Sequence, residues 1–87
     1  MDEASLTLYK LRVFCEVVEL QSFTGAAARL HTTQPALSLH MRSLEKFFGA
    51  PLVRQEGRRT VLTEAGAAVY RYATDVLRQT EIGRAHV

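Results

Sequence analysis

Residues 22–48 read SFTGAAARLHTTQPALSLHMRSLEKFF and contain two helical patterns separated by a short break. In the first pattern, Phe23 and Leu30 recur with two alanines at steps of three and four residues, which is the spacing of one helix face. Either Ser22 or Thr24 can cap this helix at its start. Residues 25–28 (GAAA) have almost no side-chain bulk, so we expect another helix to cross closely over this one.

The second pattern begins after the break at His31-Thr32. Thr33 is a suitable N-cap, and Pro35 lies in the first turn, where its missing N–H costs nothing. Gly49 suits the left-handed conformation that ends many helices. Apolar residues repeat at steps of four, three and four, at Leu37, Met41, Leu44 and Phe48. The sequence therefore predicts a second helix with a continuous core stripe.

The face of this second helix that points away from the core has small polar side chains early and positive charge later. At about 100° per residue, five side chains lie roughly 100–200° from Leu37. They are Pro35, Ser38, Leu39, Arg42 and Lys46. Two short helices joined by a tight turn, the second polar and basic outside, are typical of a helix-turn-helix motif. This motif predicts binding in the major groove of DNA.

In that groove, Gln34 can make a bidentate contact to adenine, and Ser38 can bond to several bases. Arg42 and Lys46 are better placed for phosphate or guanine. Farther along, two short runs at 51–54 and 59–62 around the turn 55–58 predict a hairpin. Its arginines can enter the minor groove or hold the DNA backbone. The predicted DNA-binding residues are Thr33, Gln34, Pro35, Ser38, Leu39, Arg42, Lys46, Arg54, Arg58 and Arg59.

Further helices are predicted on both sides of these elements. Before them, one apolar stripe consists of Leu8, Leu11, Phe14, Cys15 and Val18, with Glu16 and Glu19 turned outward. After the hairpin, Thr63 caps a last helix with Glu64 in its first turn. That helix has an apolar seam two heptads long, formed by Ala65, Val69, Tyr72 and Val76. A small domain cannot cover all of this helix, so we expect the seam to face outward and to pair with a partner helix.

Composition and charge limit the function classes. The 87 residues are enough for one small domain, and 47% of them are apolar. The net charge is +2, but residues 29–62 hold six Lys or Arg and only two Asp or Glu, a local charge of +4. Such a basic segment suits a polyanion. Neither a secretory signal nor a membrane-spanning stretch is present, so we expect a cytoplasmic, nucleoid-associated protein.

The single cysteine has no predicted chemistry. Cys15 lies on an apolar stripe, which favours a core thiol, and neither His31 nor His40 stands at a catalytic or metal-ligand spacing from it. The sequence thus predicts no catalytic residue, metal or cofactor. Two other classes fit the sequence less well. A small enzyme would need convergent carboxylates or a phosphate loop, which the sequence lacks, and the second class is a winged helix used for protein–protein contact. The second should lack the early Gln/Ser face and the basic hairpin.

Several blocks of the sequence resemble the amino-terminal domain of LysR-type transcriptional regulators. The run Ser22–Ser38 is similar to the family's signature, and so are four shorter blocks in the same order. They are Leu44-Glu45, Phe48-Gly49, Leu52–Arg54 and Leu62–Gly66. The resemblance covers roughly residues 6–80. The similar domain of molybdate-responsive regulators is the nearest alternative, and the sequence beyond the last helix would separate the two.

The resemblance implies a mainly α fold: a winged helix-turn-helix with a three-helix core, a two-stranded β-hairpin wing and a C-terminal linker helix. Residues 1–62 would form the DNA-binding domain and residues 63–80 the linker and dimerisation helix. Such proteins regulate transcription as dimers or higher homo-oligomers on double-stranded DNA with an interrupted inverted repeat. They bind a small-molecule effector through a separate C-terminal domain, which this sequence lacks.

Two features depart from the family pattern. Leu39 stands where the family often has arginine or another polar residue, so we expect contact with a thymine methyl group there. The ending Ile82–Val87 abandons the apolar spacing, and Gly83 is unfavourable inside a helix. We therefore expect residues 81–87 to be a non-native tail left by cloning or assembly.

Overall fold

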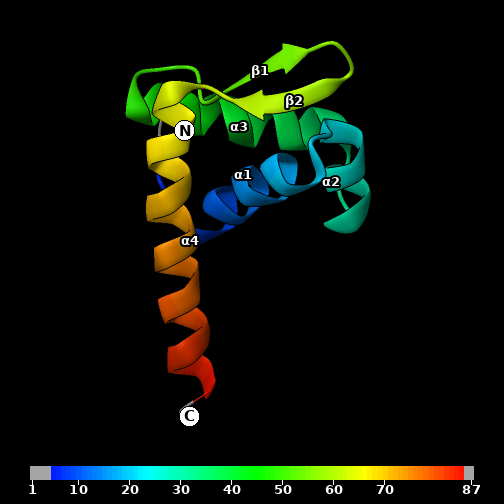
Figure 1. Ribbon diagram of the computed structural model, residues 1–87. Helices are drawn as coiled ribbons and strands as arrows, with labels where there is room; N and C mark the ends of the chain where they lie inside the picture. Colours follow the sequence, from blue (N-terminus) through cyan, green and yellow to red (C-terminus); the bar gives the residue numbers. More distant parts are fainter. Residues whose placement is uncertain (1–4, 86–87) are drawn as a thin grey trace.

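Four helices and one antiparallel hairpin make up the described chain (Figure 1). The computed structural model describes residues 5–85, and the side chains of residues 5–80. The elements are α1 (Leu8–Leu20), α2 (Phe23–Arg29), α3 (Gln34–Phe48), β1 (Val53–Glu56), β2 (Arg59–Leu62) and α4 (Glu64–Ala85). The predicted fold class, a mainly α winged helix-turn-helix, is confirmed.

Side-chain caps begin the helices at the predicted residues. The Ser22 hydroxyl accepts a hydrogen bond from the Gly25 N–H at 2.9 Å, so Ser22 and not Thr24 caps α2. The Thr33 hydroxyl accepts from the Ala36 N–H at 3.2 Å, and the Thr63 hydroxyl from the Gly66 N–H at 2.9 Å. Gly49 ends α3 with a φ of 74°. These bonds satisfy N–H groups that a helix leaves unpaired in its first turn.

Helix α1 lies at the centre of the molecule, in contact with α2, α3, α4 and β2. Leu11, Phe14 and Cys15 are buried as predicted, and Val13 and Val17 are buried as well. Because neighbours cover α1 on more than one side, the single predicted stripe was too narrow. The Phe14 and Tyr70 rings meet edge to face, 6.3 Å apart, where α4 packs across α1.

Two predictions about the edges of α1 were wrong. Leu8, placed on the core stripe, is 47% exposed because it faces an open pocket between α1 and α4, which Leu77 and Thr80 also line. Glu16 was expected to point outward, but its side chain is only 17% exposed and lies 3.8 Å from Arg29 Nε of α2. The α1–α2 packing therefore encloses this carboxylate.

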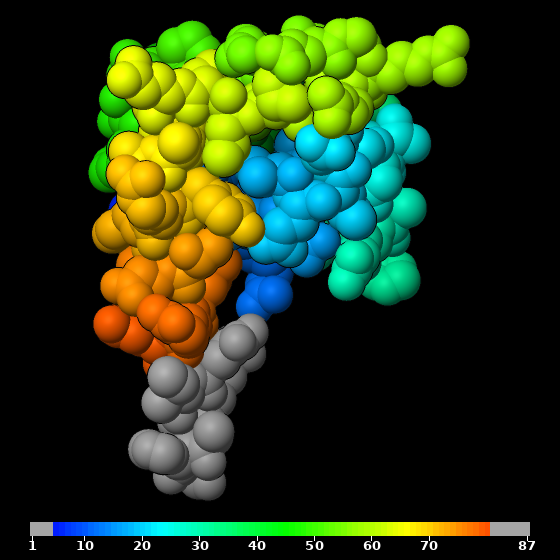
Figure 2. Space-filling model, in the orientation of Figure 1, coloured from blue at the N-terminus to red at the C-terminus, as the bar shows by residue number. Residues whose placement is uncertain are grey.

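The turn of the wing is shorter than the sequence predicted. Strands β1 and β2 pair up to Glu56 and Arg59, so the connecting loop is Gly57-Arg58 rather than residues 55–58. Gly57 has a φ of 62°, a conformation that glycine adopts without the steric cost of a Cβ atom. The tip of the wing projects from the upper edge of the molecule (Figure 2).

Helix α4 is anchored at its start. Gly66 packs so closely on the loop before β1 that a Cβ atom there would lie 1.9 Å from the Leu52 carbonyl oxygen. Thr63 extends the same contact, since its N–H donates to the Leu52 carbonyl oxygen at 3.1 Å. From this anchor the helix runs down one side of the molecule and extends past α1 (Figure 1).

The predicted outward seam of α4 is wrong for most of its members. Val69 is only 8% exposed, and Ala65 and Val76 pack against the core, because α1 covers this side of the helix. Only Tyr72, at 46%, is exposed. The helical backbone continues to Ala85 through Gly83, while residues 86–87 of the expected tail lie outside the described residues. None of the helices in the described part of the chain combines the length and the apolar character that a membrane span requires.

Candidate nucleic-acid interface

The outer face of α3 is assembled as its sequence pattern predicted. Leu37, Met41 and Leu44 are buried on one side of the helix. On the other side, Ser38 is half-buried and the remaining predicted residues are exposed: Gln34, Pro35, Leu39, Arg42 and Lys46. Thr33 is exposed too, but its hydroxyl already serves as the N-cap. The 61% exposure of Leu39 makes it the most exposed of the large apolar side chains in the described chain.

Buried contacts from two directions hold α3 in place. Lys10, buried on α1, donates from Nζ to the Ser43 hydroxyl of α3 at 2.9 Å. At the other end, the Glu45 carboxylate accepts from the Leu52 N–H at 2.8 Å and so fixes the loop that leads to the wing. Both charged side chains therefore set α3 relative to its neighbours.

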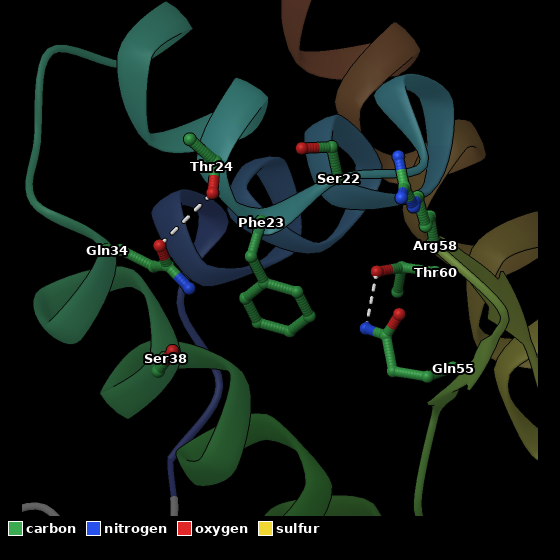
Figure 3. A pocket seen from close by; sticks show the side chains of 8 residues that line it. All are labelled: Ser22, Phe23, Thr24, Gln34, Ser38, Gln55, Arg58 and Thr60. Atoms are coloured by element: carbon green, nitrogen blue, oxygen red, sulfur yellow. Dashed lines mark hydrogen bonds between the residues drawn. The ribbon is translucent and has the colours of Figure 1, made fainter.

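A cleft separates α2 and α3 from the wing (Figure 3). Its volume is about 350 Å³, and it is lined by Ser22, Phe23, Thr24, Gln34, Ser38, Gln55, Arg58 and Thr60. It thus brings together three predicted residues, Gln34 and Ser38 from α3 and Arg58 from the wing tip. The other five lining residues were not predicted as DNA-binding residues. Thr24 could have been predicted, because a helix-turn-helix places the first turn of its first helix near the start of its second helix.

Two side-chain hydrogen bonds cross the walls of this cleft. Thr24 Oγ1 donates to Gln34 Oε1 at 3.2 Å, and Gln55 Nε2 donates to Thr60 Oγ1 at 2.8 Å (Figure 3). The first joins α2 to α3, and the second joins the two strands. The cleft walls are therefore polar and partly preorganised, which suits an occupant rich in hydrogen-bonding groups.

The wing arginines differ from one another. Arg58 and Arg59 are exposed, and Arg58 lines the cleft. Arg54 is exposed as well, but it contacts the Glu56 carboxylate at 2.5 Å on its own strand and the Leu62 carbonyl oxygen at 3.5 Å. Since Arg54 lies outside the cleft lining and is paired with a carboxylate, its positive charge is less available to a polyanion than that of Arg58.

The one thiol is unsuited to nucleophilic chemistry. Burial, chiefly, and the nearby carboxylates of Glu19 and Glu16 together raise the pKa of Cys15 from 9.0 to about 12. The thiol is therefore protonated at neutral pH. Among the residues that the structure describes, no group of three or more His, Cys, Asp or Glu side chains could hold a metal ion.

Known proteins resemble this chain in sequence over the same elements. Residues 8–67 match the model of the family described as bacterial regulatory helix-turn-helix protein, lysR family. The chain is 41% identical over 76 residues to the Hca operon transcriptional activator HcaR of Escherichia coli, covering 87% of this chain and 26% of HcaR. It is 48% identical over 63 residues to the HTH-type transcriptional activator CmpR of Synechocystis, covering 72% of this chain and 21% of CmpR.

Solved structures of the family share the fold. The DNA-binding domain of BenM in its benA site 1 DNA complex is 36% identical, with a TM-score of 0.87, covering 93% of this chain and 91% of that one. CbnR, a LysR family transcriptional regulator, is 30% identical, with a TM-score of 0.86, covering 93% of this chain and 28% of CbnR.

The chain spans only about a quarter of the length of these curated relatives, which are transcriptional regulators rather than enzymes. Its helix-turn-helix, wing and α4 correspond to the part that contains their DNA-binding domain. The family model covers more than half of the chain, and both sequence and structure agree on the assignment. The chain belongs to the LysR family of bacterial regulatory helix-turn-helix proteins, as a DNA-binding domain of a transcriptional regulator.

Proposed function

We propose that this domain binds duplex DNA with α3 in the major groove and the wing against the sugar–phosphate backbone or the neighbouring minor groove. The observation that carries the proposal is the shared surface of α3 and the wing, where Gln34, Ser38 and Arg58 line one cleft. A helix fits into the major groove, and arginines beside it can neutralise phosphates or enter the narrow groove. The DNA complex of the similar BenM domain supports binding to duplex DNA.

Within this arrangement the residues have different tasks. Gln34 and Ser38 read base edges near the start of α3, and the exposed Leu39 packs against a thymine methyl group. Arg42, Lys46, Arg58 and Arg59 bind phosphate and supply affinity that does not depend on sequence. Thr33 and Pro35 fix the start of α3 at the groove, and their backbone atoms contact the DNA there. Arg54 contributes only after its contact with Glu56 is broken.

A binding assay with single variants tests this assignment. Arg58→Ala should weaken binding to all duplexes in similar proportion and lower the log–log salt slope by about one. Gln34→Ala and Ser38→Ala should instead relax base preference, since a bidentate base contact provides about 1–3 kcal/mol of discrimination. A randomised-site selection with each variant separates the two effects. An affinity that does not change with salt would contradict the proposal.

We further propose that residues 1–62 act as the DNA-binding unit and that residues 63–80 of α4 link and pair two copies. Because α1 covers Val69, the pairing surface is the adjacent flank of α4, where Ala68 and Tyr72 are exposed. A two-fold pair would set two α3 helices against an interrupted inverted repeat. In the full-length regulator, a separate domain would bind the small-molecule effector. Such a regulator would work in the cytoplasm, at the nucleoid.

A further inference from the structure

A side chain of α2 reaches the first residue of α3 at the mouth of the cleft. Thr24 Oγ1 donates to Gln34 Oε1 at 3.2 Å, although ten residues separate the two in sequence. Figure 3 shows the Gln34 oxygen directed at Thr24 and its amide nitrogen directed away from Thr24, toward the cleft. Both side chains belong to exposed residues, so a ligand entering the cleft can reach them.

The backbone brings these two residues together for local reasons. Ser22 caps α2, so the Thr24 hydroxyl is not needed for capping and is available to another element. The chain then reverses in a tight turn, in which His31 has a φ of 56° and the Thr32 N–H donates to the Ala27 carbonyl oxygen at 2.9 Å. This turn places the start of α3 beside the start of α2.

We propose that Thr24 is a specificity-determining positioning residue, which holds the Gln34 amide in the orientation that reads a base. The inference rests on the proposed function, in which Gln34 contacts a base edge. A free glutamine side chain has several rotatable bonds and can swing to a phosphate or to a neighbouring base. An amide fixed in one orientation cannot rotate to form hydrogen bonds with a non-cognate base, so fixing it increases discrimination between sequences.

The hydrogen bond leaves the reading groups of Gln34 available. An amide oxygen has two acceptor sites, and the Thr24 hydroxyl occupies one of them. The second can accept from adenine N6, while Nε2 on the cleft side can donate to adenine N7. Water competes with this exposed bond in the free protein. Once DNA covers the cleft and excludes water, the bond becomes stronger.

The test compares Thr24→Val with Thr24→Ser in the 87-residue chain. Valine keeps the shape and the β-branch but removes the hydroxyl, whereas serine keeps the hydroxyl. The probes are duplexes selected by the parent from a randomised library, each with single base changes at the positions where Gln34→Ala relaxes preference. We expect Thr24→Val to reduce discrimination at those positions about two- to tenfold, the range of one hydrogen bond, and Thr24→Ser to retain most of it.

A double variant separates a positioning role from direct contact. If Thr24 acts through Gln34, Thr24→Val should add nothing in the Gln34→Ala background, and the salt slope should stay at the parent's value. Unchanged discrimination in Thr24→Val would overturn the proposal. So would a further loss with a smaller salt slope in the double variant, because Thr24 would then bind phosphate itself. If Gln34→Ala alone leaves base preference unchanged, the proposal that Gln34 contacts a base is contradicted, and the proposed role of Thr24 is contradicted with it.

Discussion

The backbone N–H of Thr60 donates to the carbonyl oxygen of Gln21 at 3.1 Å, which joins strand β2 of the wing to the turn before α2. Gln21 has a φ of 53°, so this carbonyl belongs to a left-handed residue at the end of α1. The Thr60 side chain is buried at the same point. This contact fixes the angle of the wing to the helix-turn-helix and therefore the width of the cleft between them.

Thr60→Pro should weaken DNA binding even though it leaves every wing arginine in place. Proline has no N–H, so the bond to Gln21 is lost and the wing can tilt away from α3. We expect a loss of about 1 kcal/mol or more in the free energy of unfolding, together with lower affinity. Thr60→Val, which keeps the N–H, is the matched control. Denaturant unfolding and DNA titration measure both, and a Thr60→Pro variant with the parent's affinity would argue against a fixed wing.

The pairing of Arg54 with Glu56 predicts unequal effects of the wing arginines. Arg54→Ala should change the salt slope of DNA binding less than Arg58→Ala, because the Arg54 guanidinium is already paired with a carboxylate at 2.5 Å. Glu56→Gln removes that partner, so it should raise affinity at low salt. In the Glu56→Gln background, Arg54→Ala should then cost more than it does in the parent. Equal losses in both backgrounds would show that the pair is broken in the DNA complex.

Two ionisable groups, Cys15 and Tyr70, have a raised pKa in the fold and so predict how stability changes at alkaline pH. The pKa of Cys15 rises from 9.0 to about 12 on folding, chiefly through burial. The unfolded chain therefore releases this proton above about pH 9, while the folded chain keeps it, so stability falls as the pH rises from 9 toward 12. Burial and the hydrogen bond to Glu19 raise the pKa of Tyr70 from 10.0 to about 12, with the same sign.

Cys15→Ala should make this alkaline loss of stability shallower, and Tyr70 should account for the part that remains. Urea unfolding from pH 8 to pH 11 measures the slope in both proteins. An independent check is alkylation by iodoacetamide at pH 8, which should be slow in the folded parent and fast after denaturation. Fast alkylation of the folded chain would contradict a buried, protonated thiol.

The two sides of α4 should respond differently to a new charge. Val69→Asp places a carboxylate in the core and should unfold the domain, because Val69 is only 8% exposed. Tyr72→Asp lies on the exposed side and should leave the fold intact while weakening the proposed pairing of two copies. Sedimentation with and without a palindromic duplex measures the pairing. A Tyr72→Asp protein that still forms the parent's dimer would exclude this side of α4 as the interface.

Gly66→Ala should be strongly destabilising. The new Cβ would lie 1.9 Å from the Leu52 carbonyl oxygen, which is backbone and cannot rotate aside. Overpacking of this kind costs about 1–3 kcal/mol, and more where the backbone must move. Gly25→Ala in α2 is the matched control, since the nearest atom to its Cβ would be the Ser22 hydroxyl oxygen at 3.3 Å. Thermal unfolding of the two variants compares them, and equal melting temperatures would contradict this packing.

Local signals in the sequence predicted the elements that depend on local chemistry. The Thr33 cap, the apolar steps from Leu37 to Leu44 and the Gly49 terminus lie within one helix, so α3 has the predicted bounds to within a residue. Its exposed face followed from the same periodicity. The LysR-type blocks correctly indicated the wing and the order of all the elements.

Features that depend on contacts between distant segments were missed. The burial of Val69 results from α4 crossing α1, and periodicity within α4 cannot tell a seam that faces the core from one that faces a partner. The bond from Thr24 to Gln34 depends on the geometry of the turn between α2 and α3. Likewise, the sequence showed Arg54 as one of three equal arginines, because side-chain pairing with Glu56 appears only when the strand is formed.

The close contact at Gly66 and the packing of Val69 and Val76 on the core hold α4 in one direction relative to the helix-turn-helix. A helix of 22 residues is about 33 Å long at about 1.5 Å per residue. A difference of only about 5° in that direction would displace its far end by roughly 3 Å, close to the rise of one base pair, about 3.4 Å. In a pair of such domains, the direction of α4 would set how far apart two binding sites on DNA can lie.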